Sequence, residues 1–331
     1  MKLASINDGS RDGQLAVVAR DLKTAHMADA IAPTLRAALD DWAFVAPQLD
    51  ALYDQLNAGQ ARRAFDFDPA RCMAPLPRAG TLAFGASWPG HLELDYLARG
   101  AEPPPWLWDE PRMVRGDPGL LGPCDDIALA HEEWGIDFGA GLAAMVDDVA
   151  AGATPDEAHG RIRLLMLVNE VALRNLVPDE RAKGGGLLQS MPAASCSPVA
   201  LTPDELGEAW RGGKLHLRLR ATLNGNLVGQ PDAGADMAFN FPQLVAHLCK
   251  TRRVGAGAIV AAGPVSNREK GGRGAVAPGS ACILDARNRE TIADGAASTP
   301  FMRFGDTIRI EMLDEKGKTV FGAIEQKVSK L

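Results

Sequence analysis

The segment from Trp134 to Gly141 has the residue spacing that most directly suggests a binding site. Asp137, Gly139 and Gly141 follow one another at intervals of two residues. Side chains two positions apart share one face of a β-strand, so a strand here would place one carboxylate beside two positions that lack a side chain. We expect an empty notch at these glycines, in which a small ligand could lie.

Two arginines could bind a carboxylate on such a ligand. Guanidinium groups pair with carboxylates through parallel hydrogen bonds, and Arg99 and Arg174 are the candidates for this contact. The alternative for each arginine is a structural ion pair or a bond to a loop carbonyl, and this alternative is slightly favoured.

The composition is that of a soluble globular protein. Hydrophobic residues make up 46% and charged residues 23% of the 331 residues, and the formal net charge is -7, which disfavours a nucleic-acid partner. The first residues lack the apolar run of a signal peptide, and no stretch approaches the roughly 18 apolar residues of a membrane span. We therefore expect a cytoplasmic protein with no membrane partner. Five scattered cysteines predict neither a disulfide framework nor a zinc knuckle.

The N-terminal part reads as a small domain of its own. Turn residues over 8–13 predict short hairpins, and Thr34 is a suitable helix N-cap. The proline-containing segment 65–79 is typical of a linker. We expect a small N-terminal domain with its linker over residues 1–74 and a larger catalytic-type domain over residues 75–331.

The larger part alternates strands with a few helices. Thr154 and Thr202 each begin a capping box with proline in the next position, which predicts a helix start. Residues 164–169 are typical of a buried strand, and Asn224-Gly225 predicts a hairpin turn. Further strands are expected near Ile259, Ile283, Ile308 and Val320. The pattern predicts a mostly β protein with some helix, of the α+β class.

Residues 101–126 are rich in proline, glycine and tryptophan. This composition suits an ordered surface loop better than a regular element. We expect the segment to lie at the surface, where it could act as a lid.

Several short segments together resemble the fumarylacetoacetate hydrolase family, and in particular its bacterial branch. The pieces that carry the resemblance are His91-Leu92-Glu93-Leu94, Arg99-Gly100-Ala101-Glu102, Trp134-Gly135-Ile136-Asp137-Phe138, Met166-Leu167-Val168-Asn169, Leu173-Arg174-Asn175-Leu176 and Phe301-Met302 with Phe304-Gly305-Asp306. The resemblance implies a mixed β-roll with peripheral helices and a small N-terminal domain. It also implies a homodimer that acts on a small-molecule substrate.

The resemblance indicates where a divalent cation would bind. The family holds the cation with four carboxylates, and their positions fall here on Phe84, Gly139, Gly141 and Glu170. One carboxylate therefore remains where a hard cation prefers several oxygen ligands. With these degenerate positions, we expect no metal cofactor.

The remaining catalytic positions of the family are partly kept. His91 matches the general base that activates water, and Asp285 falls on the glutamate, on a later strand, that pairs with this base. A carboxylate on one imidazole nitrogen fixes the tautomer and raises the basicity of the other nitrogen. The family's active-site lysine falls on Met191. Phe84, Trp88 and Met191 would together make an apolar, aromatic cavity.

Three functions follow as hypotheses. The first is an enzyme with a remodelled, metal-free site that acts on a small oxo-acid or β-dicarbonyl compound by hydrolysis, decarboxylation, isomerisation or ring closure, with His91 and Asp285 as base and Glu170 as acid. The second is a metal-dependent carbon-carbon bond hydrolase of the fumarylacetoacetase or acylpyruvase type, with Mg²⁺ or Ca²⁺ on other carboxylates such as Asp137 or the pair at 125–126. The third is a catalytically inactive binding protein. We favour the first, with substrate-binding positions at Phe84, Trp88, Arg99, Gly139, Gly141, Arg174 and Met191.

Overall fold

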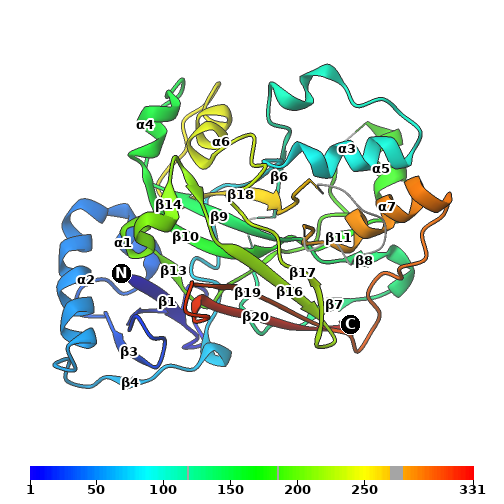
Figure 1. Ribbon diagram of the computed structural model, residues 1–331. Coiled ribbons are helices and arrows are strands. Elements are labelled where there is room, and N and C mark those ends of the chain that lie inside the picture. Colours follow the sequence, from blue (N-terminus) through cyan, green and yellow to red (C-terminus); the bar gives the residue numbers. More distant parts are fainter. Residues whose placement is uncertain (118, 185, 269–278) are drawn as a thin grey trace.

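Turn residues near the N-terminus fold the first two strands into a hairpin. Gly9 and Gly13 have positive φ angles, 86° and 65°, between β1 (Lys2–Ile6) and β2 (Gln14–Val18). The structure is a computed structural model that describes residues 1–117, 119–184, 186–268 and 279–331. The hairpin lies towards one end of the central sheet, on the left of Figure 1.

Among the described residues, eleven strands form the central sheet. Ten of them follow the order β4 (Phe65–Asp66), β3 (Thr24–Met27), β2, β1, β13 (Ala200–Leu201), β10 (Ile162–Asn169), β9 (Ala140–Val146), β18 (Ala258–Pro264), β5 (Leu82–Gly85) and β6 (Met113–Arg115). The eleventh, β12 (Ser195–Cys196), pairs with β10 beside this path. β9 is antiparallel to both β10 and β18, whereas β18 and β5 are parallel.

The middle strands are buried on both faces because separate apolar cores cover the two sides of the sheet. Every residue of β9 is buried, and Arg163 alone interrupts the buried run of β10. Leu142 and Leu167 belong to one core, and Met145 and Met166 belong to the other. Burial on both faces explains why these strands read as nearly continuous apolar runs.

A second sheet packs beside the first, in the lower part of Figure 1. Its order is β17 (Asn226–Gly229), β16 (Arg218–Leu223), β19 (Thr307–Leu313), β20 (Thr319–Lys330) and β7 (Ile127–Leu129). The predicted turn between β16 and β17 is present, with positive φ at both Asn224 and Gly225. Two short ladders pair β8 (Ile136–Asp137) with β11 (Ala172–Leu173) and β14 (Trp210–Arg211) with β15 (Lys214–Leu215).

Helices surround the sheets (Figure 1). The α-helices are α1 (Leu35–Asp40), α2 (Trp42–Asn57), α3 (Pro89–Ala98), α4 (Pro155–His159), α5 (Val177–Lys183), α6 (Phe241–Leu248) and α7 (Ile283–Asp294). The 3-10 helices are η1 (Pro69–Arg71), η2 (Pro105–Trp108), η3 (Glu132–Trp134) and η4 (Pro203–Ala209). Within the described ranges, none of these helices has the length and apolar character needed to cross a bilayer.

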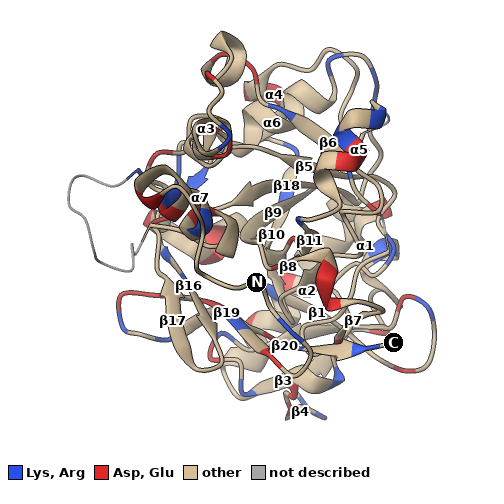
Figure 2. Cartoon of the chain, turned by 90° about the vertical axis from the view of Figure 1, so that its right-hand side faces the viewer, with Lys and Arg blue, Asp and Glu red and all other residues tan. Residues whose placement is uncertain are grey.

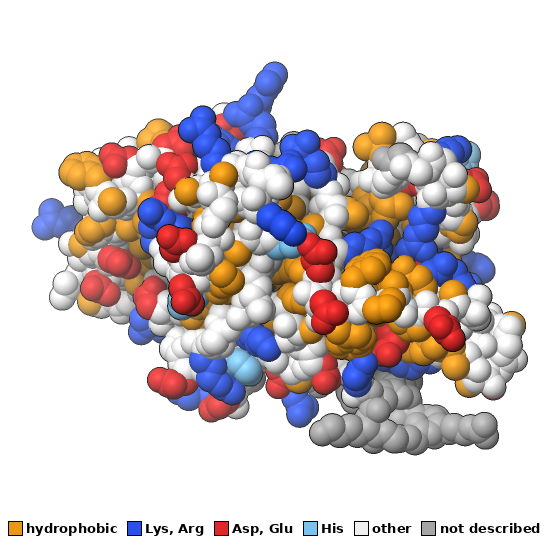
Figure 3. Space-filling model, turned by 90° about the horizontal axis from the view of Figure 1, so that it is seen from above, with side chains coloured by type: hydrophobic (Ala, Val, Ile, Leu, Met, Phe, Trp, Pro, Cys, Tyr) orange, Lys and Arg blue, Asp and Glu red, His pale blue; other side chains and the backbone are white. Residues whose placement is uncertain are grey.

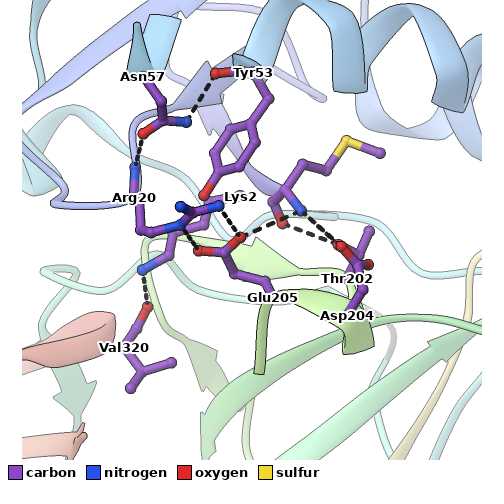
Figure 4. Close-up of polar contacts among 9 residues, drawn as sticks. Lys2, Arg20, Tyr53, Asn57, Thr202, Asp204, Glu205 and Val320 are labelled. Atoms are coloured by element: carbon purple, nitrogen blue, oxygen red, sulfur yellow. Dashed lines mark hydrogen bonds and ion pairs between the residues drawn. The ribbon is translucent and has the colours of Figure 1, made fainter. Parts of the chain in front are cut away.

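Polar contacts join the N-terminal strands to the rest of the chain (Figure 4). Lys2 Nζ donates to the carbonyl oxygen of Val320 over 2.7 Å, and Arg20 Nε donates to Glu205 Oε1 over 2.9 Å. β1 also pairs with β13, so the central sheet continues across the predicted boundary near residue 74. The two-domain division stays a prediction.

The α+β class predicted from the sequence is confirmed, and most local signals agree with the structure. Thr34 caps α1 by accepting from the Ala37 amide over 3.1 Å, and Thr154 begins α4 with the predicted capping box. Thr202 differs, because it precedes the 3-10 helix η4 and makes no side-chain cap bond.

The strand expected near Ile283 is helix α7 instead. The cause is a distant residue. The buried Asp137 carboxylate accepts hydrogen bonds from the backbone amides of Ile283 and Leu284, over 2.7 and 3.2 Å. These amides would otherwise lack partners at the helix N-terminus.

Candidate active site

Strands of the central sheet bring the predicted site residues to one edge. Asn169 at the end of β10 pairs with Ala140 at the start of β9, and Gly141 pairs with Pro264 at the end of β18. β5 runs parallel to β18 and ends there at Gly85. The segments that follow β5, β10 and β18 therefore leave the sheet at the same end, on the side of α3, α5 and α7 at the right of Figure 1.

A cavity of about 100 Å³ opens at this edge. It combines apolar side chains with a serine, a histidine, one carboxylate and two arginines. Its lining residues are Phe84, Gly85, Ala86, Ser87, Trp88, His91, Arg112, Val114, Glu170, Ala172, Arg174, Leu187, Met191, Ala262, Gly263 and Pro264. A mostly apolar wall with a few convergent polar groups is typical of a small-molecule site.

A larger groove of about 1120 Å³ lies between the N-terminal strands and the turn that joins β19 to β20. Part of its charge is neutralised within the groove, as in the pair between Arg20 and Glu205. Among the described residues of its lining, no histidine bonds a carboxylate. We therefore place the candidate active site in the smaller cavity.

His91 and Asp285 form a buried pair at the cavity. His91 Nδ1 lies 2.6 Å from Asp285 Oδ1. Asp285 Oδ2 accepts from the hydroxyls of Ser266 and Ser280, over 2.6 and 3.0 Å. Burial alone would raise the pKa of Asp285, but the His91 imidazole and the Ser266 hydroxyl together lower it to about 2. An ionised Asp285 holds the proton on Nδ1 and leaves Nε2 as the basic nitrogen.

Two helices position this pair. Pro89 occupies the first turn of α3, where its missing amide costs no hydrogen bond, and His91 follows in the same turn. Asp285 lies in the first turn of α7, not on the strand that the resemblance implied. His91 lines the cavity whereas Asp285 lies behind it, so the imidazole presents Nε2 to the cavity.

Glu170 lies directly after β10 and lines the same cavity. Its Oε1 accepts from the backbone amide of Gly263 over 3.1 Å. Burial raises the pKa of Glu170 to about 8, although the Gly263 amide opposes the shift. At neutral pH this carboxyl group is therefore mainly protonated and can donate a proton.

The expected empty notch at Gly139 and Gly141 does not exist, because Glu170 fills the space beside Gly139 and the Gly263 backbone fills the space beside Gly141. A Cβ at position 139 would meet the carbonyl oxygen of Glu170 at 2.7 Å, and a Cβ at position 141 would meet that of Gly263 at 2.5 Å. Neither glycine lines the cavity. Their role is to let the backbone on each side approach closely, and a larger side chain has no room there.

We expect Gly141→Ala to lower the free energy of unfolding by roughly 1–3 kcal/mol, because the new methyl group would press on backbone rather than on a flexible side chain. Denaturant unfolding of the wild type and of Gly141→Ala measures this difference in the free energy of unfolding. Gly80→Ala is the matched control, since nothing lies within 4 Å of its Cβ position. Equal stabilities of the two variants would contradict the close packing.

The two arginines expected to bind a carboxylate are engaged by the protein. Arg174 lines the cavity, but its Nε donates to Asp137 Oδ2 over 2.8 Å. Arg99 lies on the outer side of α3, where it pairs with Asp95 over 3.2 Å and stacks on Tyr96. Arg99 does not line the cavity. For both residues the structure shows the structural ion pair that was the alternative interpretation.

The other predicted positions come together. Phe84, Trp88 and Met191 line the cavity with His91 and Glu170. Their side chains make one wall apolar, as expected from their residue types. Their part in substrate binding stays a prediction.

Comparison with known proteins identifies the family of this chain. Residues 1–78 match the family described as fumarylacetoacetase N-terminal domain 2, and residues 88–329 match the fumarylacetoacetate hydrolase C-terminal family. The chain belongs to the fumarylacetoacetate hydrolase family. The predicted membership is thereby confirmed.

Similar members of the family are enzymes that act on small oxo-acids. Oxaloacetate tautomerase YisK of Bacillus subtilis (strain 168) is 25% identical over 201 residues, which are 60% of this chain and 62% of that protein's length. Maleylpyruvate hydrolase from Sphingobium sp. SYK-6, solved with manganese(II) and pyruvate, has a TM-score of 0.63 at 14% identity, with coverage of 100% of this chain and 99% of that chain. The 5-carboxymethyl-2-hydroxymuconate delta-isomerase from Mycobacterium smegmatis has a TM-score of 0.58 at 13% identity, with the same coverage.

The expectation of no metal cofactor is wrong. The maleylpyruvate hydrolase structure contains manganese(II), and this chain also offers ligands for an ion. One ligand atom each from His91, Cys282 and Asp285 lies within 4.8 Å of the others, and all three residues are buried. Nitrogen, sulfur and carboxylate oxygen are the usual ligands of a divalent cation such as zinc. These residues therefore fit a cation, at a place other than the four family positions.

The second hypothesis placed a cation on Asp137 or on the 125–126 pair. Both Asp137 oxygens already accept hydrogen bonds, from Arg174 and from the N-terminus of α7. Asp125 accepts from the Gly122 amide over 2.7 Å and does not line the cavity. Cys282 was interpreted from the sequence only as a small buried residue, yet its Sγ lies 3.8 Å from His91 Nδ1.

Arg112 is a charged cavity residue that the sequence did not indicate. It lies in the segment 101–126, which was expected to be a surface loop. The segment instead contributes β6 to the central sheet, where Val114 pairs with Phe84 and Met113 with Gly85. This pairing places Arg112 at the cavity, and no local sequence signal predicted it.

Proposed function

We propose that this chain is a tautomerase or isomerase of short-chain 2-oxo acids, which moves a proton between the carbon next to the ketone and the ketone oxygen. The observation that carries the proposal is the convergence of a His91-Asp285 pair and the buried carboxyl group of Glu170 on one small cavity. A base and an acid on one substrate are what enolisation requires.

His91 is the base in this proposal. Its Nε2 takes the proton from the substrate carbon, and the positive imidazolium that results is stabilised by the buried carboxylate of Asp285 over 2.6 Å. The hydroxyls of Ser266 and Ser280 hold that carboxylate in place. In the reverse direction the imidazolium returns a proton to carbon while Glu170 takes the proton from the enol oxygen. After either direction, His91 and Glu170 return to their starting states by exchanging one proton through solvent, so no other reactant is consumed.

Glu170 is the acid. Its protonated carboxyl group donates to the ketone oxygen as negative charge develops there, and the product is the enol. The Gly263 amide holds Oε1, which fixes the orientation of the carboxyl group. The apolar wall of Phe84, Trp88 and Met191 limits the access of water to the enol.

A divalent cation on His91, Cys282 and Asp285 would add positive charge to this site and act as a Lewis acid. The apolar wall would exclude water with or without the ion.

Hydrolysis of a carbon-carbon bond is the second candidate. The same imidazole could activate a water molecule, and the maleylpyruvate hydrolase has the same overall fold. A fold shared at 14% identity does not fix the reaction. Enolisation and carbon-carbon bond hydrolysis must therefore be distinguished by experiment.

Both reactions can be measured on the purified protein. We expect it to accelerate the conversion of enol-oxaloacetate to the keto form, followed by the loss of enol absorbance, and to leave the carbon skeleton intact. Cleavage of maleylpyruvate without an effect on oxaloacetate would favour the hydrolase. No turnover of either compound or of other short 2-oxo acids would support the inactive binding protein.

A further inference from the structure

Arg112 differs from Arg174 because, within the described parts of the chain, its guanidinium makes no hydrogen bond or ion pair. It lines the cavity with His91 and Glu170 and is partly buried. The other arginine of the lining, Arg174, is neutralised by Asp137 over 2.8 Å. Arg112 is therefore the cation that the described lining leaves uncompensated.

Asp95, the carboxylate whose charge acts on Arg112, already pairs with other arginines. Asp95 Oδ2 accepts from Arg99 and from Arg181, over 3.2 Å in each case, so its one negative charge is shared between two other guanidinium groups. Burial lowers the pKa of Arg112, and the positive charge of Arg181 adds to the shift. A partly desolvated cation in a positive neighbourhood is costly unless an anion joins it.

Basic side chains lie on the side of the molecule that carries α5 and β6. Lys and Arg positions of α5 and of the segment around β6 lie on the same side of the molecule in Figure 2. Seen from above, Lys and Arg side chains lie among hydrophobic ones at the right of the molecule (Figure 3). Positive charge on low-dielectric walls attracts small anions to an opening.

Different elements hold the acid and the guanidinium. Glu170 Oε1 accepts from the Gly263 amide of β18, whereas Arg112 directly precedes β6 and feels the charges of Arg181, Tyr96 and Asp95 on α5 and α3. Both side chains line the same cavity. A ligand that reaches from one to the other would have its charge at Arg112 and its reacting atoms near Glu170 and His91.

We propose that Arg112 is the subsite for a substrate carboxylate, so that the cavity takes a short 2-oxo acid bound through one carboxylate while the rest of the molecule contacts uncharged walls. The reaction of the bound acid rests on the proposed function, whereas the binding of its carboxylate at Arg112 does not. It gives Arg112 the role that the sequence had suggested for Arg99 or Arg174. Its guanidinium can donate two parallel hydrogen bonds, which an ammonium group cannot.

The test is the affinity for pyruvate, measured by calorimetry on the full chain, with KM and kcat for oxaloacetate measured separately. We expect Arg112→Met to weaken pyruvate binding roughly 10- to 100-fold, as for the loss of a charge-assisted hydrogen-bonded pair. Arg112→Lys should lose less, because it keeps the charge. Arg99→Met is the matched control and should change affinity less than about threefold, since Arg99 lies outside the cavity.

The outcomes separate the two proposals. Unchanged pyruvate affinity in folded Arg112→Met, or in Arg112→Lys if the first variant does not fold, would overturn the subsite and leave the tautomerase proposal standing. Loss of affinity in a protein without turnover would support the subsite and reject the reaction. The melting temperature of Arg112→Met should not fall, because the replacement removes an unpaired cation.

Discussion

Replacing His91 with glutamine should lower kcat for the enolisation of oxaloacetate by about 10²- to 10⁴-fold, the usual contribution of a general base. Glutamine can still donate an amide hydrogen to Asp285, but it has no basic nitrogen to present to the cavity. The fold should survive, because Asp285 keeps its hydrogen bonds from Ser266 and Ser280. Steady-state kinetics and circular dichroism measure the two effects.

Asp285→Asn is the matched test of the partner. An amide offers its NH₂ group to Nδ1 and thereby favours the tautomer that carries the proton on Nε2, so this variant should lose a comparable part of kcat. KM should change little in both variants, because neither residue is expected to bind the carboxylate. If His91→Gln kept kcat within about threefold of the wild type while folded, His91 would not be the base.

Replacing Glu170 with glutamine should remove a pH dependence of stability. The carboxyl group has a pKa of about 8 in the folded chain against an ordinary value of 4.5, so the folded state holds the proton more tightly than the unfolded state. This difference contributes to the free energy of unfolding. The contribution is fully present below pH 4.5 and is lost as the pH rises towards 8. The loss in the free energy of unfolding is at most about 5 kcal/mol, because each of the pH units between the two pKa values corresponds to roughly 1.4 kcal/mol.

The measurement is denaturant unfolding of wild type and Glu170→Gln across this pH range. The variant should be the more stable protein at the alkaline end, and the two curves should converge at the acidic end. Glu208→Gln is the control, since Glu208 is exposed and its replacement should leave the slope unchanged. The same slope in wild type and Glu170→Gln would show that Glu170 is ionised in the folded chain, and it could not then be the acid.

Much of the fold follows from local signals. The capping boxes, the Asn224-Gly225 turn and the apolar run over 164–169 each depend on neighbouring residues, and each appears where expected apart from the one at Thr202. His91 and Glu170 were found through short motifs, and the structure brings both to one cavity. The arrangement of these two residues in space could not be predicted, because it depends on how separate strands and helices pack against one another.

The differences arise from long-range contacts. α7 begins at Ile283 because Asp137, 146 positions earlier, accepts a hydrogen bond from its first amide. The notch at Gly141 is filled because the Gly263 backbone, 122 positions later in the chain, approaches it closely. Arg112 reaches the cavity through the pairing of β6 with β5. Each of these contacts joins residues far apart in the sequence, so no local sequence pattern predicts it.

The claim that His91 removes a proton from carbon is tested most directly by deuterium exchange. Pyruvate in D₂O should gain deuterium at its methyl carbon faster with the wild-type protein than without protein, as followed by proton NMR. His91→Gln should abolish this acceleration, and Arg99→Met should not affect it. Exchange at the same rate with the wild type and His91→Gln, or at the uncatalysed rate with both for every short 2-oxo acid tried, would contradict an acid-base site in this cavity.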